Sequence, residues 1–491
     1  KALLLRCLDQ VRIGRSHFCS SMCFPEQNKS AGEHDARVKT VALFNGEGSG
    51  HLNPMLALSV ALVKRGWEVH FFSPPSVSRQ VEGTGAVWCR YGSENWNLFE
   101  AAKKVAERLP VQPDAEVFQQ IMPYAVVPAT LDVLPFLVGR MAQIRPDFVV
   151  FDAACPWGWV LSQLLCIPAA CSMTALPASL SERETTSWTE WSSTRTLDAV
   201  VEIIRGAYGI SLNHNYSYEN YTDYTIVWSS RAWHRGNEEF CQNKFHYWGS
   251  VVSATQASGR GSVTDGDRAL RALADLGDRQ LVFISMGTVA TGTLFHTFAP
   301  SLEDFYRKVL AVAESMPQVT FVVSLGRSVP TEVDEEGCIC KVFSDIVVSS
   351  NVVAARCVDQ LVVLTRAAAF VTHCGMNSSS EAVANGVPVV AVPFFGDQLR
   401  NASRFEELGC GIQQRYTRGF HSRLGWQPDH SLISEESLST ALRRVLEEPQ
   451  FREAACALRA KQNEECGQLD ANLSHLLQYV EEFTSTTTTM V

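Results

Sequence analysis

The 491-residue sequence lacks several features that would assign it to other classes of protein. It has no run of about 18 or more uncharged apolar residues, so it predicts no membrane span. It also lacks a basic excess, because its net charge of -10 argues against nucleic acid or an anionic membrane surface as the main partner. Its 15 cysteines lack the paired spacing of a metal site, and scattered thiols favour a reduced, cytoplasmic protein.

Apolar segments alternate with helical stretches along most of the chain, whose length exceeds that of one hydrophobic core. Apolar runs that stop at a loop predict buried strands, and apolar residues spaced three and four apart predict the helices between them. The predicted strands lie at 40–44, 69–72, 147–151, 281–285, 319–323, 369–372 and 389–392. We therefore predict an α/β protein with two tandem doubly wound, Rossmann-like domains that face a cleft.

Changes in composition predict where these domains begin and end. The stretch 249–268 is rich in Ser, Gly, Thr and Asp, which is typical of a linker. The predicted parts are a disordered leader at 1–37, an N-terminal domain at 38–248, a linker at 249–268, a C-terminal domain at 269–466, a helix at 467–483 that packs back on the N-terminal domain, and a disordered tail at 484–491. The apolar triplet Leu3–Leu5 is too short to identify a targeting segment.

The most informative segment is 372–381, with the sequence THCGMNSSSE. A predicted strand ends at Thr372 and a predicted helix begins near Asn377, so free backbone N–H groups lie beside Asn377 and Ser378. The N-terminus of a helix is a natural seat for a phosphate or diphosphate. His373 lies at the strand end beside this seat.

Three further polar residues follow at positions that suit the rest of a nucleotide-sugar. Glu381 lies one turn into the same helix, where its carboxylate can accept hydrogen bonds from ribose hydroxyls. Asp397 and Gln398 follow the next predicted strand, at the level of a sugar ring attached to the diphosphate. The segment therefore predicts a site for a nucleotide-activated sugar.

This ordered set of residues resembles the donor motif of the UDP-glycosyltransferase superfamily, and especially of its macrolide-glycosyltransferase-like members. The family motif reads Trp-x-Pro-Gln, His-x-Gly-x-Asn-Ser-x-x-Glu, Gly-x-Pro and Asp-Gln, and almost all of it is present in order. The resemblance covers about Val38 to Val480. It implies the GT-B glycosyltransferase architecture, an acceptor-binding N-terminal domain and a nucleotide-sugar-binding C-terminal domain. It further implies a UDP-sugar as co-substrate, a small-molecule acceptor, and neither a cofactor nor a metal.

The resemblance also implies a role for each residue that matches the motif. The implied donor-binding residues are Thr288, Gln360, His373, Gly375, Asn377, Ser378, Glu381, Asp397 and Gln398. The Asp397–Gln398 pair is the family pattern associated with glucose, which is favoured over galactose, glucuronic acid or N-acetylglucosamine. Two positions depart from the pattern, since Cys357 replaces the base-stacking tryptophan and Asp359 replaces proline. A strict preference for uracil therefore stays open.

His51 is the candidate catalytic base in the first half of the chain. It follows a glycine-rich loop at the start of a predicted helix, where a neutral imidazole can take a proton from an acceptor hydroxyl. Asp152 ends another predicted strand and can hold the second N–H of the ring. In the resembled family a Gly-His pair before Asn-Pro carries the base and a strand-end aspartate completes the dyad, which implies catalytic roles for His51 and Asp152.

Two other functions are compatible with parts of the sequence. A dinucleotide oxidoreductase needs a third glycine after the first strand, and His51 occupies that place. A non-catalytic nucleotide-sugar-binding regulator would keep the donor motif without needing His51 and Asp152.

The only Asp-x-Asp, 265–267, lies in the predicted linker and does not predict a metal site. Aromatic residues at 96–99 and 187–191 suit a lipophilic or aromatic acceptor, and core packing explains them equally well.

Overall fold

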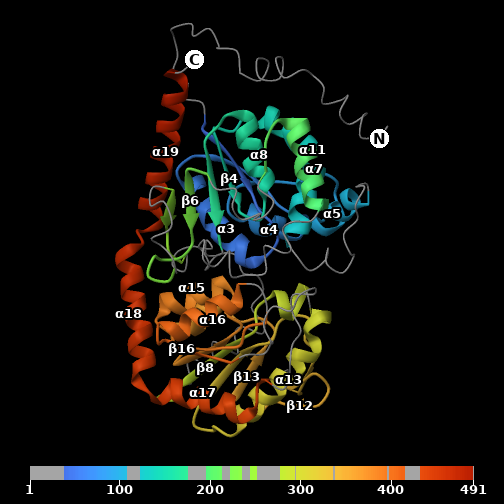
Figure 1. Cartoon of the computed structure of the whole chain (residues 1–491). Helices are drawn as coiled ribbons and strands as arrows, with labels where there is room; N and C mark the ends of the chain where they lie inside the picture. The colour runs from blue at the N-terminus through green and yellow to red at the C-terminus, as the bar shows by residue number, and fades with distance from the viewer. Residues whose placement is uncertain are drawn as a thin grey trace.

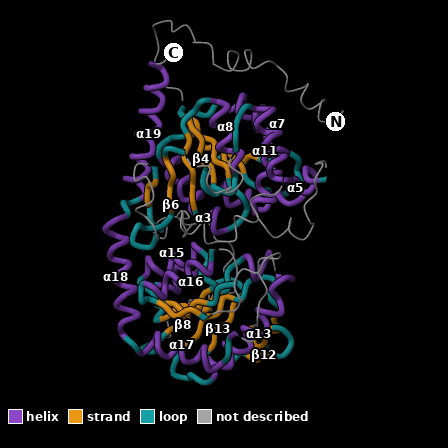
Figure 2. The backbone as a smooth tube through the Cα atoms, in the orientation of Figure 1, coloured by secondary structure: helices purple, strands orange, loops and turns teal. Residues whose placement is uncertain are grey.

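The computed structural model consists of two α/β lobes, one above the other in Figure 1. Figure 2 shows a sheet at the centre of each lobe. The predicted leader, most of the predicted linker and the segment 187–191 lie outside the described residues. The described residues are 38–107, 122–174, 195–212, 222–234, 244–250, 277–293, 295–335, 338–394, 397–414 and 432–489.

The N-terminal domain has a seven-stranded parallel sheet with the order β3-β2-β1-β4-β5-β6-β7. Every residue of β1, β4 and β5 is buried, as expected for strands with helices on both faces. The strands are β1 (Thr40–Phe44), β2 (Glu68–Phe72), β3 (Val87–Cys89), β4 (Phe148–Asp152), β5 (Ala169–Met173), β6 (Tyr224–Val227) and β7 (Phe245–Tyr247). The described helices are α3 (Ser49–Lys64), η1 (Pro75–Val77), α4 (Ser78–Glu82), α5 (Leu98–Ala106), α7 (Met122–Ile144), α8 (Pro156–Leu165) and α11 (Arg195–Tyr208).

The C-terminal domain has a six-stranded parallel sheet with the order β13-β9-β8-β14-β15-β16, and a small antiparallel sheet, β10-β11-β12. Its strands are β8 (Leu281–Ser285), β9 (Thr320–Ser324), β10 (Thr331–Val333), β11 (Ile339–Val342), β12 (Ile346–Val347), β13 (Val352–Ala355), β14 (Ala369–Thr372), β15 (Val389–Ala391) and β16 (Gly411–Gln413). Its helices are η5 (Val289–Thr293), α13 (Phe295–Glu314), α14 (Gln360–Leu364), α15 (Met376–Asn385), α16 (Gln398–Glu407), α17 (Glu435–Glu447) and α18 (Pro449–Glu465). The prediction of two tandem doubly wound domains is thus confirmed.

The strand order of each sheet reverses at one place, and this place positions the candidate site. In the first sheet β1 lies between β2 and β4, so the chain runs outward from β1 on one side and continues at β4 on the other. In the second sheet β8 lies between β9 and β14 in the same way. Ligands of open α/β sheets bind beyond the carboxyl ends of the strands at such a switch point. Four candidate site residues lie at these switch points. They are His51 after β1, Asp152 at the end of β4, Thr288 after β8 and His373 after β14.

The last helix, α19 (Leu469–Thr489), returns to the N-terminal domain and runs alongside the upper lobe in Figure 1. Leu473, Leu476 and Val480 of α19 are buried in one apolar cluster with residues of α3. At its start, Arg65 donates hydrogen bonds to the backbone oxygen of Asp470, at 2.6 Å, and to the hydroxyl of Ser474, at 2.9 Å. The helix continues through Thr489, so residues 484–489, which the sequence predicted as part of a disordered tail, are helical.

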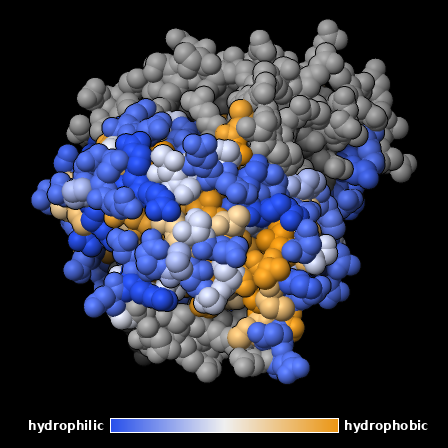
Figure 3. Space-filling view, turned by 90° about the horizontal axis from the view of Figure 1, so that it is seen from below, coloured by the Kyte–Doolittle hydropathy of each residue, from blue (hydrophilic) through white to orange (hydrophobic). Residues whose placement is uncertain are grey.

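The face seen from below in Figure 3 is mostly hydrophilic, with hydrophobic residues gathered in a band across it. Within the described residues, no helix combines the length and apolar character that crossing a bilayer requires.

Candidate active site

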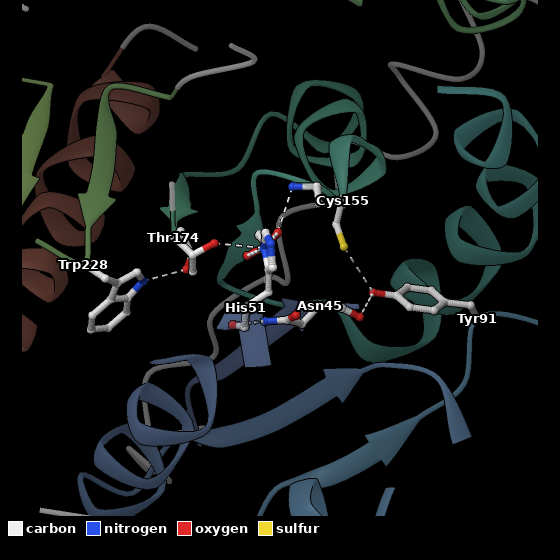
Figure 4. A network of polar contacts seen from close by, with 9 residues as sticks. Asn45, His51, Tyr91, Cys155, Thr174 and Trp228 are labelled. Atoms are coloured by element: carbon white, nitrogen blue, oxygen red, sulfur yellow. Dashed lines mark hydrogen bonds and ion pairs between the residues drawn. The ribbon is translucent and has the colours of Figure 1, made fainter. Parts of the chain in front are cut away.

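His51 and Asp152 form the centre of the N-terminal half of the site. Asn45, directly after β1, donates its side-chain amide to the backbone oxygen of His51 at 2.9 Å and so fixes the first turn of α3. The two carboxylate oxygens of Asp152 lie 2.9 and 3.0 Å from Nδ1 of His51. The Asp152 side chain is fully buried, whereas that of His51 is 32% exposed. The structure therefore brings the predicted pair together, and Figure 4 shows the His51 ring at the centre of a polar network.

The charges around His51 determine its protonation state. Burial lowers the pKa of His51, but the charge and hydrogen bond of Asp152 and the charge of Asp397 together outweigh it, and the pKa of His51 is raised from its usual value. Because an ionised carboxylate can only accept a hydrogen bond, the proton between the two residues belongs to Nδ1. The lone pair of the neutral ring is therefore on Nε2, the nitrogen a general base would use.

A third residue at this centre, Thr174, was not among the residues that the sequence predicted. Thr174 directly follows β5, and its Oγ1 lies 2.9 Å from Nδ1 of His51. β5 pairs with β4 in parallel register, with Ser172 opposite Asp152. A polar residue just beyond the strand next to β4 was the one available indication, because parallel strands end at the same edge of the sheet.

The C-terminal half of the site is the N-terminus of α15. This helix begins at Met376 with Gly375 as its N-cap, one residue before the predicted start. Asn377 and Ser378 lie in the first turn, where backbone N–H groups have no partner inside the helix. Positive charge from the helix dipole adds to these donors, so the turn has the donors and the charge that a diphosphate seat needs.

His373 is held between two backbone segments that require glycine. A Cβ atom on Gly287 would overlap Cε1 and Nε2 of the His373 ring. A Cβ atom on Gly375 would lie 2.5 Å from Nε2. Burial lowers the pKa of His373 to about 4, against a smaller opposing effect of the Ser285 backbone. At neutral pH the ring is therefore uncharged and can offer one N–H to an anion.

Gln360 and Glu381 lie together beside this seat. Nε2 of Gln360 donates to Oγ of Ser378 at 3.2 Å and forms a short hydrogen bond to Oε2 of Glu381. The Glu381 side chain is buried in α15, one turn in from the helix start. An amide and a carboxylate fixed in this way present both donors and acceptors, which suits a ribose ring.

Asp397 and Gln398 lie at the start of α16. Oδ2 of Asp397 accepts a hydrogen bond from the Asn401 amide at 3.0 Å, and burial raises the pKa of Asp397. Oε1 of Gln398 accepts from the backbone N–H of Phe394 at 2.8 Å. The charge of Asp397 contributes to the raised pKa of His51, although the two residues belong to different domains. The role of this pair in holding the sugar stays a prediction.

Ser49 joins the two halves of the site. Its hydroxyl lies 2.8 Å from Oγ1 of Thr288, in the loop after β8, and its backbone oxygen accepts a hydrogen bond from Asn377 at 3.4 Å. Ser49 is the first residue of α3, two positions before His51. The sequence did not predict its role, because contacts between domains leave no periodic pattern in a sequence.

The region expected to hold the base departs from the family pattern in the structure too. Cys357 is exposed, and it offers no ring on which a base can stack. Asp359 acts as the N-cap of α14, accepting hydrogen bonds from the N–H groups of Leu361 at 3.2 Å and Val362 at 3.4 Å. Asp359 therefore has a structural reason to replace proline, whereas Cys357 has none that we find.

Of the aromatic residues considered for acceptor binding, Trp96 belongs to the core. It is 9% exposed and packs against Tyr91 at 4.8 Å and Trp157 at 6.2 Å between ring centroids. Core packing, one of the two explanations given for Trp96, therefore accounts for it. The other aromatic stretch, 187–191, lies outside the described residues.

Comparisons with known proteins agree with this geometry. The family model for UDP-glucoronosyl and UDP-glucosyl transferase matches residues 357–465. The NDP-glycosyltransferase YjiC of Bacillus licheniformis is 27% identical over 76% of this chain and 84% of its own length. Oleandomycin glycosyltransferase of Streptomyces antibioticus is 24% identical over 82% of this chain and 86% of its own. The solved structure of the glycotransferase of kitacinnamycin has a TM-score of 0.66 and 22% identity, covering 90% of this chain and 99% of that one.

These matches cover the parts of the chain that form the site. The family model includes all of α14, α15 and α16, which carry Gln360, Glu381 and Gln398. The relatives extend the similarity over most of the chain, and the solved structure shares the GT-B fold. These comparisons confirm the resemblance to UDP-glycosyltransferases that the sequence indicates.

Proposed function

We propose that this chain is an inverting glycosyltransferase that moves a hexose, with glucose favoured, from a UDP-sugar to a hydroxyl of a small lipophilic or aromatic acceptor. The observation that carries the proposal is the His51–Asp152 pair at 2.9 Å, opposite the N-terminus of α15 in the other domain. A positioned base facing an anion seat is what transfer from a nucleotide diphosphate requires. The relative named for oleandomycin supports a small-molecule acceptor.

The donor would lie along the switch point of the C-terminal sheet. Thr288, His373, Asn377 and Ser378, with Gly375 allowing close approach, would hold the diphosphate at the start of α15. Gln360 and Glu381 would bind the base and ribose side of the nucleotide. The helix dipole and neutral donors would offset part of the diphosphate charge, and we propose a reaction that needs neither a cofactor nor a divalent metal.

The reaction would be a direct displacement at the anomeric carbon. Nε2 of His51 takes the proton of the acceptor hydroxyl while that oxygen bonds to the anomeric carbon. The bond from the anomeric carbon to the UDP oxygen breaks on the opposite face, so the configuration inverts. Asp152 stabilises the imidazolium that forms, and the start of α15 stabilises the charge on the leaving diphosphate.

The sugar and the cellular setting follow from other residues. Asp397 and Gln398 at the start of α16 would bind the sugar hydroxyls, and the charge of Asp397 acts on His51, which is in keeping with the preference for glucose. We propose a cytoplasmic protein without nucleic acid as a partner, because the net charge is -10 and the described cysteines form no disulfide with one another.

The test is to incubate the full chain with UDP-glucose and a mixed panel of phenolic, steroid and macrolide acceptors. Mass spectrometry should find hexosylated products, and the anomeric proton coupling in their NMR spectra should show a β-linkage from the α-linked donor. Product formation should survive addition of EDTA. An α-linked product would contradict the inverting mechanism.

The alternative is a nucleotide-sugar-binding regulator without transfer activity. It would keep the donor seat around α15, but nothing in that role needs the His51–Asp152 hydrogen bond. Calorimetry, which measures the binding of UDP-glucose, separates the two functions when it is combined with the product assay. UDP-glucose that binds the protein but yields no product with any acceptor of the panel would favour the regulator.

A further inference from the structure

The hydroxyl of Thr174 is a second polar group beside Nδ1 of His51, the nitrogen that Asp152 also contacts. Its Oγ1 lies 2.9 Å from Nδ1, as close as the nearer oxygen of Asp152. We propose that Thr174 is a positioning residue, which together with Asp152 fixes the plane of the His51 ring so that Nε2 faces the acceptor hydroxyl. This inference rests on the proposed role of His51 as the base.

One hydrogen bond to Asp152 does not fix an imidazole ring. The ring can still turn about χ2, a torsion with broad minima, while Nδ1 stays close to the carboxylate. A second acceptor beside Nδ1 removes this freedom. The Asn45 amide holds the backbone oxygen of His51, so backbone and ring are each restrained.

Thr174 is itself held firmly enough to position another residue. It is 6% exposed and directly follows β5, whose neighbours β4 and β6 pair with it on both sides. The preceding residue, Met173, accepts a backbone hydrogen bond from Trp228 at 3.2 Å, and the Trp228 indole donates to Ser172 at 2.9 Å. A β-branched side chain on such a strand end has few rotamers. Figure 4 shows Thr174 and Trp228 on the same side of His51.

Charged groups from two domains and two buried thiols surround Nδ1 of His51. The charged groups that act on it are Asp152 at the end of β4 and Asp397 at the start of α16. Two buried thiols, Cys155 and Cys171, lie near Asp152, and burial raises the pKa of each well above its usual value. Both thiols therefore stay uncharged over the pH range in which His51 titrates.

The test compares the full chain with Thr174→Val, which keeps the shape and removes the hydroxyl, and Thr174→Ser, which keeps the hydroxyl. Losing one hydrogen bond to the base should lower kcat roughly threefold to tenfold, with the KM for UDP-glucose changed by less than about twofold. Nδ1 of the imidazolium also loses an acceptor, so the acid limb of the kcat/KM profile should move to lower pH. Thr174→Ser should restore both.

A second measurement does not depend on activity. Long-range ¹H–¹⁵N spectra of protein labelled at histidine report the tautomer and titration of each ring, and His51→Gln identifies the signal by its loss. In Thr174→Val the His51 titration should move to lower pH. If the valine variant does not fold, as circular dichroism would reveal, Thr174→Ala takes its place.

Two results would overturn the inference. One is an unchanged His51 titration and an unchanged kcat in Thr174→Val. The other is a raised donor KM with an unchanged titration, which would make Thr174 a donor contact. Failure of the proposed function is distinguishable, because it would leave every variant inactive while the spectra still report how Thr174 acts on His51.

Discussion

At the scale of single residues, the chemistry depends on which nitrogen of His51 carries the proton. Asp152 is fully buried and its oxygens lie 2.9 and 3.0 Å from Nδ1, so the proton is held there and the lone pair is on Nε2. The same carboxylate stabilises the imidazolium that would form after proton transfer. Asp152 thus both orients the His51 ring and stabilises the charge of the imidazolium. A substitution that keeps the shape of Asp152 but removes its charge separates the two effects.

Asp152→Asn removes the charge but keeps the shape of the side chain. We expect kcat to fall on the order of 10²-fold, because the asparagine amide favours the wrong tautomer and does not stabilise the imidazolium. The base works only when neutral, so activity rises with pH through the pKa of His51. Asp152 raises this pKa, and its loss should move the acid limb to lower pH.

Asp147→Asn is the matched control, because Asp147 also bonds the sheet backbone, accepting from Thr40 at 2.7 Å, but precedes β4 at the opposite edge. It should leave the pH profile unchanged. An acid limb that stays in place in Asp152→Asn would contradict the assigned tautomer.

The residues of the site differ in how far the sequence alone could predict them. Asp152 and His373 each end or follow an apolar strand, and that position in the sequence is enough to place them at the correct edge of a sheet. Thr174 contacts His51 and Ser49 contacts Thr288, but a lone hydroxyl residue at the end of a strand or the start of a helix is too common to single out. Trp96 was singled out as a candidate for acceptor binding, but it is buried in the core. The sequence cannot separate these two roles, because an aromatic residue in a loop can pack in a core or contact a ligand.

At the scale of elements, the start of α15 is the part that binds the charge of the donor. Its N-cap, Gly375, is in contact with the His373 ring, which leaves no room for a side chain. Gly287, at φ 75°, presses on the other side of the same ring and adopts a left-handed backbone that favours glycine. The imidazole and the helix start therefore form one rigid unit.

Gly375→Ala tests this unit. The new Cβ would lie 2.5 Å from Nε2 of His373, so the ring must move away from the helix start. We expect the Kd for UDP to rise by about tenfold, which corresponds to the loss of one good hydrogen bond to a charged group. Calorimetry measures it.

Gly139→Ala is the control, because an added Cβ meets nothing within 4 Å there and α7 lies in the other domain. Its affinity for UDP should equal that of the native chain. Unchanged affinity in Gly375→Ala would show that His373 does not take part in holding the diphosphate.

The elements themselves were more predictable than their ends. Strands such as β8 were expected at the residues where they occur, because a buried apolar run between turns has few other interpretations. The Thr-rich end of α19 was predicted as a tail, since Ser and Thr are weak helix formers. It is helical because the residues before it, including Leu473, Leu476 and Val480, anchor α19 on the N-terminal domain. Such tertiary packing is not visible in local composition.

At the scale of the whole molecule, the two domains touch through two different kinds of contact. Trp233, which follows β6, is buried in the apolar cluster of the C-terminal domain, 4.5 Å from the Phe405 ring, and its backbone oxygen accepts from Arg404 at 2.8 Å. The contact of Ser49 with Thr288 is a single hydrogen bond between exposed hydroxyls. We expect the second contact to break when substrate enters or product leaves.

A reversible lock tests this expectation. In the double variant Ser49→Cys with Thr288→Cys, the two sulfur atoms would replace hydroxyl oxygens that lie 2.8 Å apart, close enough for a disulfide after a small shift. Oxidation should stop turnover because the donor can neither enter nor leave, and a reductant should restore it. The two single variants control for the substitutions themselves and for other exposed thiols such as Cys166. Equal rates in the oxidised and reduced double variant would show that the domains need not separate at this contact.

Release of UDP from UDP-glucose is the most direct test that His51 acts as the base of a glycosyl transfer. It should be measured with and without the acceptor panel, for the native chain and for His51→Ala. We expect release that depends on the acceptor in the native chain, and a loss of about 10²- to 10⁴-fold in the variant, the usual contribution of a general base. A variant that releases UDP as fast as the native chain would contradict the catalytic role of His51.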